Sequence, residues 1–155
     1  MEQFENPHKH KVHHVLAHSY SVYFILFLIG FFLDLVYKVS LFADSTMLPL
    51  GVSILVLATG LIFWAQKTGR DFKKVAEVKM EHFCRGPYCY TRIPTQFGLF
   101  FLMLGFGIIT NSFFVSLLAV VAFIIAKFVF IGKQEKMLEQ KYGVHYTEYK
   151  KAVKF

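Results

Sequence analysis

Charged residues are scarce in this sequence. Asp, Glu, Lys and Arg make up only 17% of its 155 residues, whereas 55% are hydrophobic, among them 19 Phe. This balance excludes an ordinary soluble domain of the same length and predicts a single integral membrane domain over residues 1–155. Glycine-rich phosphate loops, nucleophile elbows and nucleic-acid-binding motifs are also missing, so we expect no nucleic-acid partner.

Cysteine is scarce as well. The two cysteines, Cys84 and Cys89, are too few for a structural zinc site, and we expect no metal there. Both lie in a basic segment. Basic segments of membrane proteins typically stay in the cytoplasm, where thiols are reduced. A disulfide is therefore not expected. The N-terminus also has no short apolar core followed by a cleavage site, so no removable signal peptide is predicted.

Lysine and arginine are missing from alternate connections between the apolar runs. Two basic residues precede the first run, seven lie within residues 67–92, and six lie within residues 133–154. Basic residues accumulate in cytoplasmic loops of membrane proteins. We therefore expect an integral membrane protein whose two termini and active site all face the cytoplasm.

Four apolar runs predict an all-α polytopic membrane protein with short amphipathic cytoplasmic helices. The last two runs are split only by Asn111 and Ser112, which predicts a tight helical hairpin. The third run would be roughly 24 Å long, short for a hydrocarbon core of about 30 Å. The expected transmembrane helices cover residues 19–42, 48–65, 95–110 and 113–131.

Small and charged residues stand out within these apolar runs. Gly98, Gly105 and Gly107 would let neighbouring helices approach closely. Asp34 and Lys38 lie four residues apart, so an ion pair on one helix face near the far interface is the favoured interpretation. A buried functional carboxylate at Asp34 is the alternative.

The connection at residues 66–84 is charged and amphipathic. Its apolar residues fit one face of a helix, but part of it alternates as a strand would. Both interpretations stay open. In either case, we expect a solvated segment that lies along the membrane surface, with Lys73 and Lys74 attracted to anionic headgroups.

Residues 85–98 form a polar, aromatic, turn-rich segment between the two hydrophobic halves. Gly86 and Pro87 indicate a turn, and Pro94 suits the first position of a helix. We therefore predict a non-helical lead-in to a helix N-terminus. Arg92 and the neighbouring tyrosines would lie near free backbone N–H groups, where an anionic ligand group is easily held.

Charge returns at residues 132–155. The composition predicts a helix that ends at Gly143, followed by a second short helix that carries Tyr146 and Tyr149. In the expected topology this segment faces the same aqueous side as residues 85–98. The two segments are thus expected to form one site, open to a water-soluble cofactor on one side and to a lipid on the other.

Histidines are concentrated near the N-terminus. On a helix, His10, His14 and His18 would share one face because they are spaced by four residues. A solvated segment facing the lipid headgroups is the favoured interpretation, ahead of transition-metal binding and of an iron site for oxidation.

Two sets of residues resemble a known family. The first is Gly-Pro-Tyr-x-Tyr-x-Arg-x-Pro at residues 86–94, and the second is Glu-x-x-Leu followed by Tyr-Gly-x-x-Tyr-x-x-Tyr within residues 135–149. With a helical hairpin between them, they resemble the isoprenylcysteine carboxyl methyltransferase and phospholipid methyltransferase superfamily of membrane enzymes. The resemblance covers about the last 75 residues.

The resemblance implies methyl transfer from S-adenosylmethionine to a lipophilic acceptor, such as an isoprenylcysteine-like carboxylate or a phospholipid amine. The acceptor would come from the bilayer, whose lipids would be the other partners. The family's cofactor pocket corresponds in this sequence to Tyr88, Tyr90, Arg92, Pro94, Glu135, Tyr146 and Tyr149.

Arg92 and Glu135 are the two residues to which the resemblance gives a catalytic role. Arg92 would hold the cofactor's carboxylate and Glu135 its ammonium, while a tyrosine face would contact the sulfonium. The sequence departs from the family pattern at Ile93, where a histidine is usual, and at Gln134, where a second glutamate is usual. Two alternatives remain: a lipid or sterol-type reductase that uses NADPH, and a non-catalytic lipid-binding protein.

Overall fold

The computed structural model describes residues 7–42, 47–72 and 84–153, and in these residues it is helical, without a named strand. The predicted all-α fold class is confirmed. The elements are α1 (Pro7–Tyr37), α2 (Leu48–Phe72), the 3₁₀ turn η2 (Gly86–Cys89), α4 (Pro94–Ile109), α5 (Phe113–Ile125), the π-helical segment η3 (Ala126–Ile131), α6 (Gly132–Tyr142) and α7 (Val144–Ala152).

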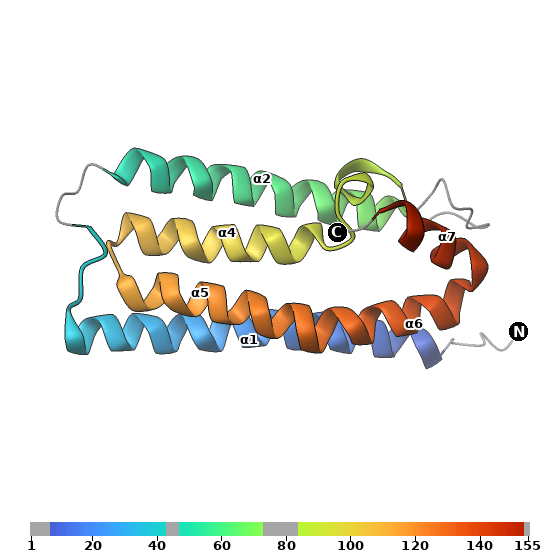
Figure 1. Cartoon of the computed structure of the whole chain (residues 1–155), viewed down its shortest axis with the longest axis horizontal. Coiled ribbons are helices and arrows are strands. Elements are labelled where there is room, and N and C mark those ends of the chain that lie inside the picture. Colours follow the sequence, from blue (N-terminus) through green and yellow to red (C-terminus); the bar gives the residue numbers. More distant parts are fainter. Residues whose placement is uncertain (1–6, 43–46, 73–83, 154–155) are drawn as a thin grey trace, which may run out of the picture.

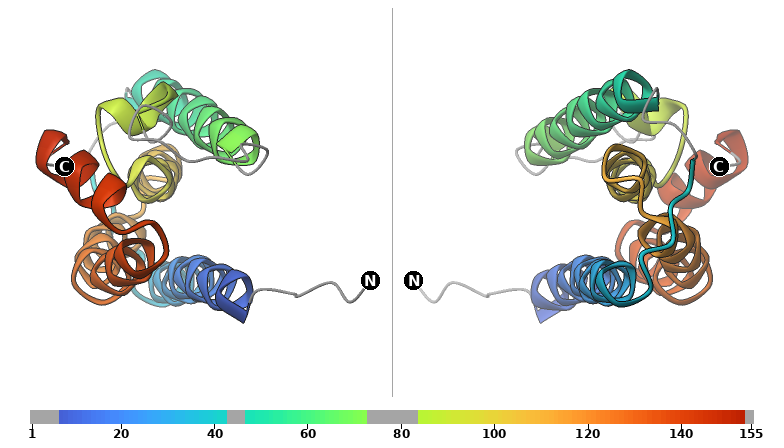
Figure 2. Two further views of the ribbon diagram at one scale, coloured as in Figure 1. Left: turned by 90° about the vertical axis from the view of Figure 1, so that its right-hand side faces the viewer. Right: turned by 90° about the vertical axis from the view of Figure 1, so that its left-hand side faces the viewer.

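The four long rods lie side by side in a row (Figure 1). Helix α1 packs against α5, α5 against α4, and α4 against α2. Seen end-on, the row is bent into an arc with α1 and α2 at its two ends, and α7 crosses from α6 towards η2 (Figure 2). The arc thus brings η2, α6 and α7 to one end of the bundle.

Among the residues that the structure describes, three helices are long and apolar enough to cross a membrane, namely those at His18–Tyr37, Leu48–Asp71 and Phe113–Gln140. Helix α4 is also apolar, but it has only 16 residues. Many large apolar side chains on the outer faces of the bundle are exposed, as expected where lipid is the solvent.

The observed helices differ from the predicted runs at several boundaries, among them the ends of α1 and α2. Helix α1 ends at Tyr37 rather than at residue 42, because Lys38 adopts a positive φ of 48°, which a right-handed helix does not accommodate. Helix α2 continues to Phe72, so residues 66–72 are helical. The rest of the amphipathic connection, residues 73–83, lies outside the described residues.

Glycines set the spacing between α2 and α4. A Cβ added at Gly105 would lie 3.1 Å from the Gly51 carbonyl oxygen, and one added at Gly98 would meet the Ile62 side chain. Gly107 in turn lies against Ser116 of α5. The predicted close approach at the three glycines of α4 is confirmed, and it brings the N-terminal end of α4 close to α2.

Asp34 acts as a cap between helices. Its two carboxylate oxygens accept hydrogen bonds from the backbone N–H groups of Phe114 and Val115, each at 3.1 Å, in the first turn of α5. These donors have no partner within their own helix, and a negative charge is favourable at a helix N-terminus. Asp34 forms no ion pair with Lys38 among the described contacts. The favoured ion-pair interpretation is therefore wrong.

We expect Asp34→Ala to lower the free energy of unfolding by about 1–2 kcal/mol, because it leaves two N–H groups of α5 without an acceptor. Lys38→Ala is the matched control and should have little effect. Thermal unfolding of the detergent-solubilised protein measures both. Equal destabilisation by the two changes would favour the ion pair and contradict the cap.

Candidate functional site

The turn η2 is fixed against α2. Gly86 has a φ of +56°, and a Cβ there would lie 2.7 Å from the Thr68 hydroxyl and 3.0 Å from the Trp64 indole nitrogen. Only glycine accepts both this conformation and this contact easily. The chain then turns over Pro87, which is buried. Residues 86–89 therefore form one short 3₁₀ turn within a segment that the sequence predicts to be non-helical.

This turn also brings Cys84 and Cys89 together. Their Cα atoms are 4.4 Å apart and the two residues form a disulfide. The expectation of free thiols is therefore wrong. It was based on a cytoplasmic location for this segment, which carries no information about the distance between the two cysteines. The 3₁₀ turn folds the chain back on itself within five residues and so brings them into reach of each other.

Glu135 is positioned by one continuous helical rod. Helix α5 passes through η3 into α6 without a break, and the rod ends at Gly143, which has a φ of +55°. The predicted helix end at Gly143 is confirmed. A π-helical segment shifts the helical phase, and such segments are frequent at functional sites. Here η3 immediately precedes the turn of α6 that carries Glu135.

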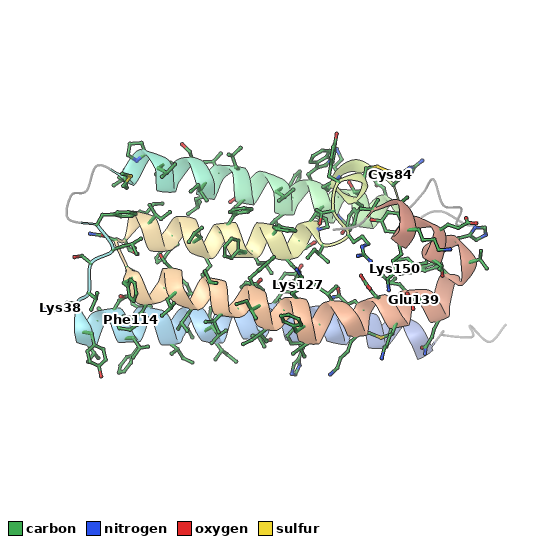
Figure 3. All side chains as sticks on the ribbon, in the orientation of Figure 1. Lys38, Cys84, Phe114, Lys127, Glu139 and Lys150 are labelled. Atoms are coloured by element: carbon green, nitrogen blue, oxygen red, sulfur yellow. A yellow bond between two sulfur atoms is a disulfide. The ribbon has the colours of Figure 1, made fainter. Side chains whose placement is uncertain are left out.

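The centre of the candidate site is a group of paired charges. Arg92 Nη1 lies 2.6 Å from Glu135 Oε1, and Lys150 Nζ lies 2.8 Å from both Glu135 Oε2 and Glu139 Oε1. The side chains of Arg92 and Glu135 are each 17% exposed, so water screens them only partly. Hydrogen bonds to the two glutamates raise the pKa of Lys150 to about 12. Lys150 and Glu139 lie at the same end of the bundle as Cys84 (Figure 3).

Two tyrosines of α7 close this group of charges. Tyr146 and Tyr149 are buried, and their ring centroids are 5.9 Å apart. The Tyr149 hydroxyl donates a 2.6 Å hydrogen bond to the Tyr88 carbonyl oxygen, which ties α7 to η2. Burial, with a further contribution from Glu135, raises the pKa of Tyr146 to about 12, and burial also raises the pKa values of Tyr149 and Tyr88.

The structure brings together five of the seven residues proposed for cofactor binding: Tyr88, Arg92, Glu135, Tyr146 and Tyr149. Tyr90 is 81% exposed and does not belong to this group of five residues. Pro94 is buried at the first position of α4, as its helix-start role predicted. The binding roles of all seven residues stay predictions. The side chains of the histidines before His18 lie outside the described residues.

Sequence reasoning missed Lys150. The residue lies four positions after Tyr146, so it shares a face of α7 with the two tyrosines. That spacing was available as a signal, but lysines in a basic C-terminal segment are ordinarily solvated. It also missed a polar contact between helices, in which the Gln96 amide nitrogen donates to the Ser19 hydroxyl at 2.7 Å.

Comparison with known proteins gives one family. Residues 46–145 match the family model described as phospholipid methyltransferase. The chain belongs to the phospholipid methyltransferase family. No curated protein and no solved structure matches the chain. Membership supports a membrane methyltransferase, and the matched range includes Arg92 and Glu135 but ends before Tyr146.

The buried tyrosines predict a late step in an alkaline titration. A raised pKa means that the folded protein holds the phenolic proton of Tyr146 more tightly than the unfolded chain does. Its contribution to stability is therefore complete below pH 10.0, the ordinary value, and is lost as the pH rises through about 12. Ultraviolet absorbance of tyrosinate should show a step near pH 12.

Two variants test the assignment of that step. Tyr146→Phe should reduce its amplitude, whereas Tyr90→Phe should leave it in place because Tyr90 lies outside the packed cluster. A Tyr146→Phe variant whose late step is unchanged would contradict the burial of this side chain against α6.

Proposed function

We propose that the protein transfers a methyl group from S-adenosylmethionine to a lipophilic acceptor at the cytoplasmic face of a membrane. The acceptor is an isoprenylcysteine-like carboxylate or a phospholipid amine. The observation that carries this proposal is the partly buried Arg92–Glu135 pair, which lies within the family match. It offers two opposite charges at one point, as the amino-acid end of the cofactor requires.

The pair suits a zwitterionic ligand because Arg92 and Glu135 can release each other and bind the ligand's carboxylate and ammonium instead. The Arg92 guanidinium is planar and can bind a carboxylate through two parallel hydrogen bonds. Glu135 can accept hydrogen bonds from an ammonium while Lys150 continues to hold its second oxygen. Neither charge is then left without a partner, which would be costly in this partly buried position.

Methyl transfer itself needs positioning more than acid–base catalysis. The cofactor would supply an electrophilic methyl group on a sulfonium, and the sulfur would be released as a neutral thioether once the methyl group had been transferred. Tyrosine faces attract such cations, and Tyr146 and Tyr149 lie beside the charged pair. Their burial against α6 also excludes water from that side, which favours transfer to the lipid acceptor over reaction with water.

The departures from the family pattern affect this site in different ways. Gln134 places its amide nitrogen in a buried position without a hydrogen-bond partner among the described residues. This atom is a donor that a bound ligand can satisfy. Ile93 offers only its backbone to polar contacts, so we propose that Lys150 and Gln134 provide the polar interactions that the usual histidine would make.

Four membrane crossings form part of the proposal. Helix α4 is short, but its N-terminus at Pro94 would lie at headgroup level and open towards the cofactor. Two observations bear on the side of the membrane. The basic residues favour the cytoplasm, whereas a disulfide favours an oxidising compartment. We give more weight to the seven basic residues at 67–92 than to the single disulfide.

Calorimetric titration of the detergent-purified protein with S-adenosylhomocysteine, the product of methyl transfer, tests this function. We expect saturable binding, with NADPH as a control that does not bind. Binding of NADPH alone would favour a reductase. Binding of neither ligand by well-folded protein would contradict the proposal and favour a non-catalytic lipid-binding protein.

The same titration tests the role of Arg92. Arg92→Ala should weaken binding by about 10- to 100-fold, because it removes a charge-assisted contact worth 1.5–3 kcal/mol. Folding should survive, since Lys150 still pairs with Glu135. Arg70→Ala, at an exposed arginine near the end of α2, is the matched control and should bind normally. An Arg92→Ala variant with unchanged affinity would contradict the assignment.

A further inference from the structure

The disulfide closes the turn on which helix α7 docks. Cys84 and Cys89 are bonded to each other, and the loop that they close contains residues 85–88. Within this closed loop, the Tyr88 carbonyl oxygen accepts the 2.6 Å hydrogen bond from the Tyr149 hydroxyl of α7. The acceptor that holds α7 in place is therefore part of the loop whose shape the disulfide restrains.

Other contacts attach the closed loop to the bundle without the cysteines. Gly86 packs closely on Trp64 and Thr68 of α2. The side chain of Tyr88 is hydrogen-bonded to Thr95 in the first turn of α4. Both contacts are noncovalent and would survive reduction of the disulfide. Reduction would therefore leave the turn beside α2 and α4 while it releases the two ends of the loop from each other.

The closed loop acts on the paired charges by two routes. Arg92 follows Cys89 by three residues and holds one carboxylate oxygen of Glu135. Lys150 follows Tyr149 directly and holds the other carboxylate oxygen. A change in the position of the Tyr88 carbonyl is thus transmitted to Glu135 through the chain that leads to Arg92 and through α7.

A permanent cross-link is unexpected at this place in the chain. The seven basic residues at 67–92 favour a cytoplasmic location, where disulfides are usually transient. The two cysteines are only five residues apart, so their bond restrains the unfolded chain less than a bond across a long loop would. Cys84 is exposed and Cys89 is half-buried, so a thiol in solution can reach the pair. A disulfide that is made and broken accounts for both the basic residues and the bond.

We propose that Cys84 and Cys89 form a redox switch that sets the position of α7 over the candidate site. This inference rests on the proposed cytoplasmic location, which is part of the proposed function. The oxidised pair holds the Tyr88 carbonyl oxygen where the Tyr149 hydroxyl reaches it. Two thiols need more room than two bonded sulfurs, so the ends of the loop move apart on reduction and the hydrogen bond to α7 weakens.

The reductant is a small cytosolic thiol such as glutathione. Its thiolate attacks Sγ of Cys84, the more exposed of the two residues, and forms a mixed disulfide. The bond to Cys89 breaks, and the Cys89 sulfur leaves with the electron pair and takes up a proton. A second glutathione then attacks the glutathione sulfur of the mixed disulfide, and Cys84 leaves as a thiol. Two glutathione thiols have become one disulfide, and the protein has gained two thiols.

Hydrogen–deuterium exchange of the detergent-purified full-length protein measures the response of α7. The oxidised protein is compared at neutral pH with protein equilibrated with excess reduced glutathione, and thiol alkylation reports the state of the pair. We expect α7 (Val144–Ala152) to exchange about 2- to 10-fold faster after reduction, because one hydrogen bond that holds it is weakened. Helix α5, which packs on α1 and α4, should keep its rate. An unchanged rate in α7 of fully reduced protein would overturn the inference.

Three variants test the route of this response. A double variant, Cys84→Ser with Cys89→Ser, should exchange in α7 like the reduced wild-type protein and should not respond to glutathione. Tyr149→Phe keeps the disulfide but removes the hydroxyl that donates to Tyr88, so its α7 should exchange fast in both redox states. Tyr37→Phe, at an exposed tyrosine of α1, is the matched control and should respond like the wild-type protein. A wild-type response in Tyr149→Phe would contradict the proposed switch.

The remaining outcomes separate the switch from the proposed function. A pair that stays oxidised in a large excess of reduced glutathione is a permanent cross-link and would overturn the switch. We expect the reduced protein to bind S-adenosylhomocysteine about 2- to 10-fold more weakly than the oxidised protein. Equal affinities in the two states would overturn the inference, because such a movement regulates nothing. A response of α7 in a protein that binds no S-adenosylhomocysteine in either state would support the switch and contradict only the methyltransferase proposal.

Discussion

The ion pair between Arg92 and Glu135 is the contact on which the candidate site depends. It joins the segment before α4 to the extension of α5, two parts of the chain that are 43 residues apart. At 17% exposure the two charges interact more strongly than they would in bulk water, and each would be costly to leave alone. The pair therefore stabilises the position of both segments. It also presents a positive and a negative charge that can bind the two charged groups of a zwitterionic ligand.

The rest of the structure supplies the geometry for this pair. The continuous rod of α5, η3 and α6 carries Glu135 beyond the apolar bundle, and close packing of α2 on α4 holds the start of α4 near η2. Helix α7 then folds back so that Tyr149 reaches Tyr88 and Lys150 reaches Glu135. A polar site at the edge of an apolar bundle thus has a lipid-facing side and a water-facing side.

Local sequence signals predicted local structure well. Hydropathy indicated the helices, Pro94 the start of α4 and Gly143 the end of α6, because each depends on nearby residues only. The grouping of Arg92 with Glu135 came from a family resemblance. Contacts between distant residues were not predictable from periodicity.

The Asp34 cap joins residues 80 and 81 positions apart, and the Ser19–Gln96 bond joins residues 77 positions apart. Nothing in the local sequence distinguishes such side chains from ordinary polar residues in an apolar run.

The most direct test of the paired-charge account compares S-adenosylhomocysteine with methylthioadenosine, which lacks the amino-acid end. We predict that the wild-type protein binds the former at least about tenfold more tightly, and that Glu135→Gln removes most of this difference. Equal affinities in the wild-type protein would contradict the account.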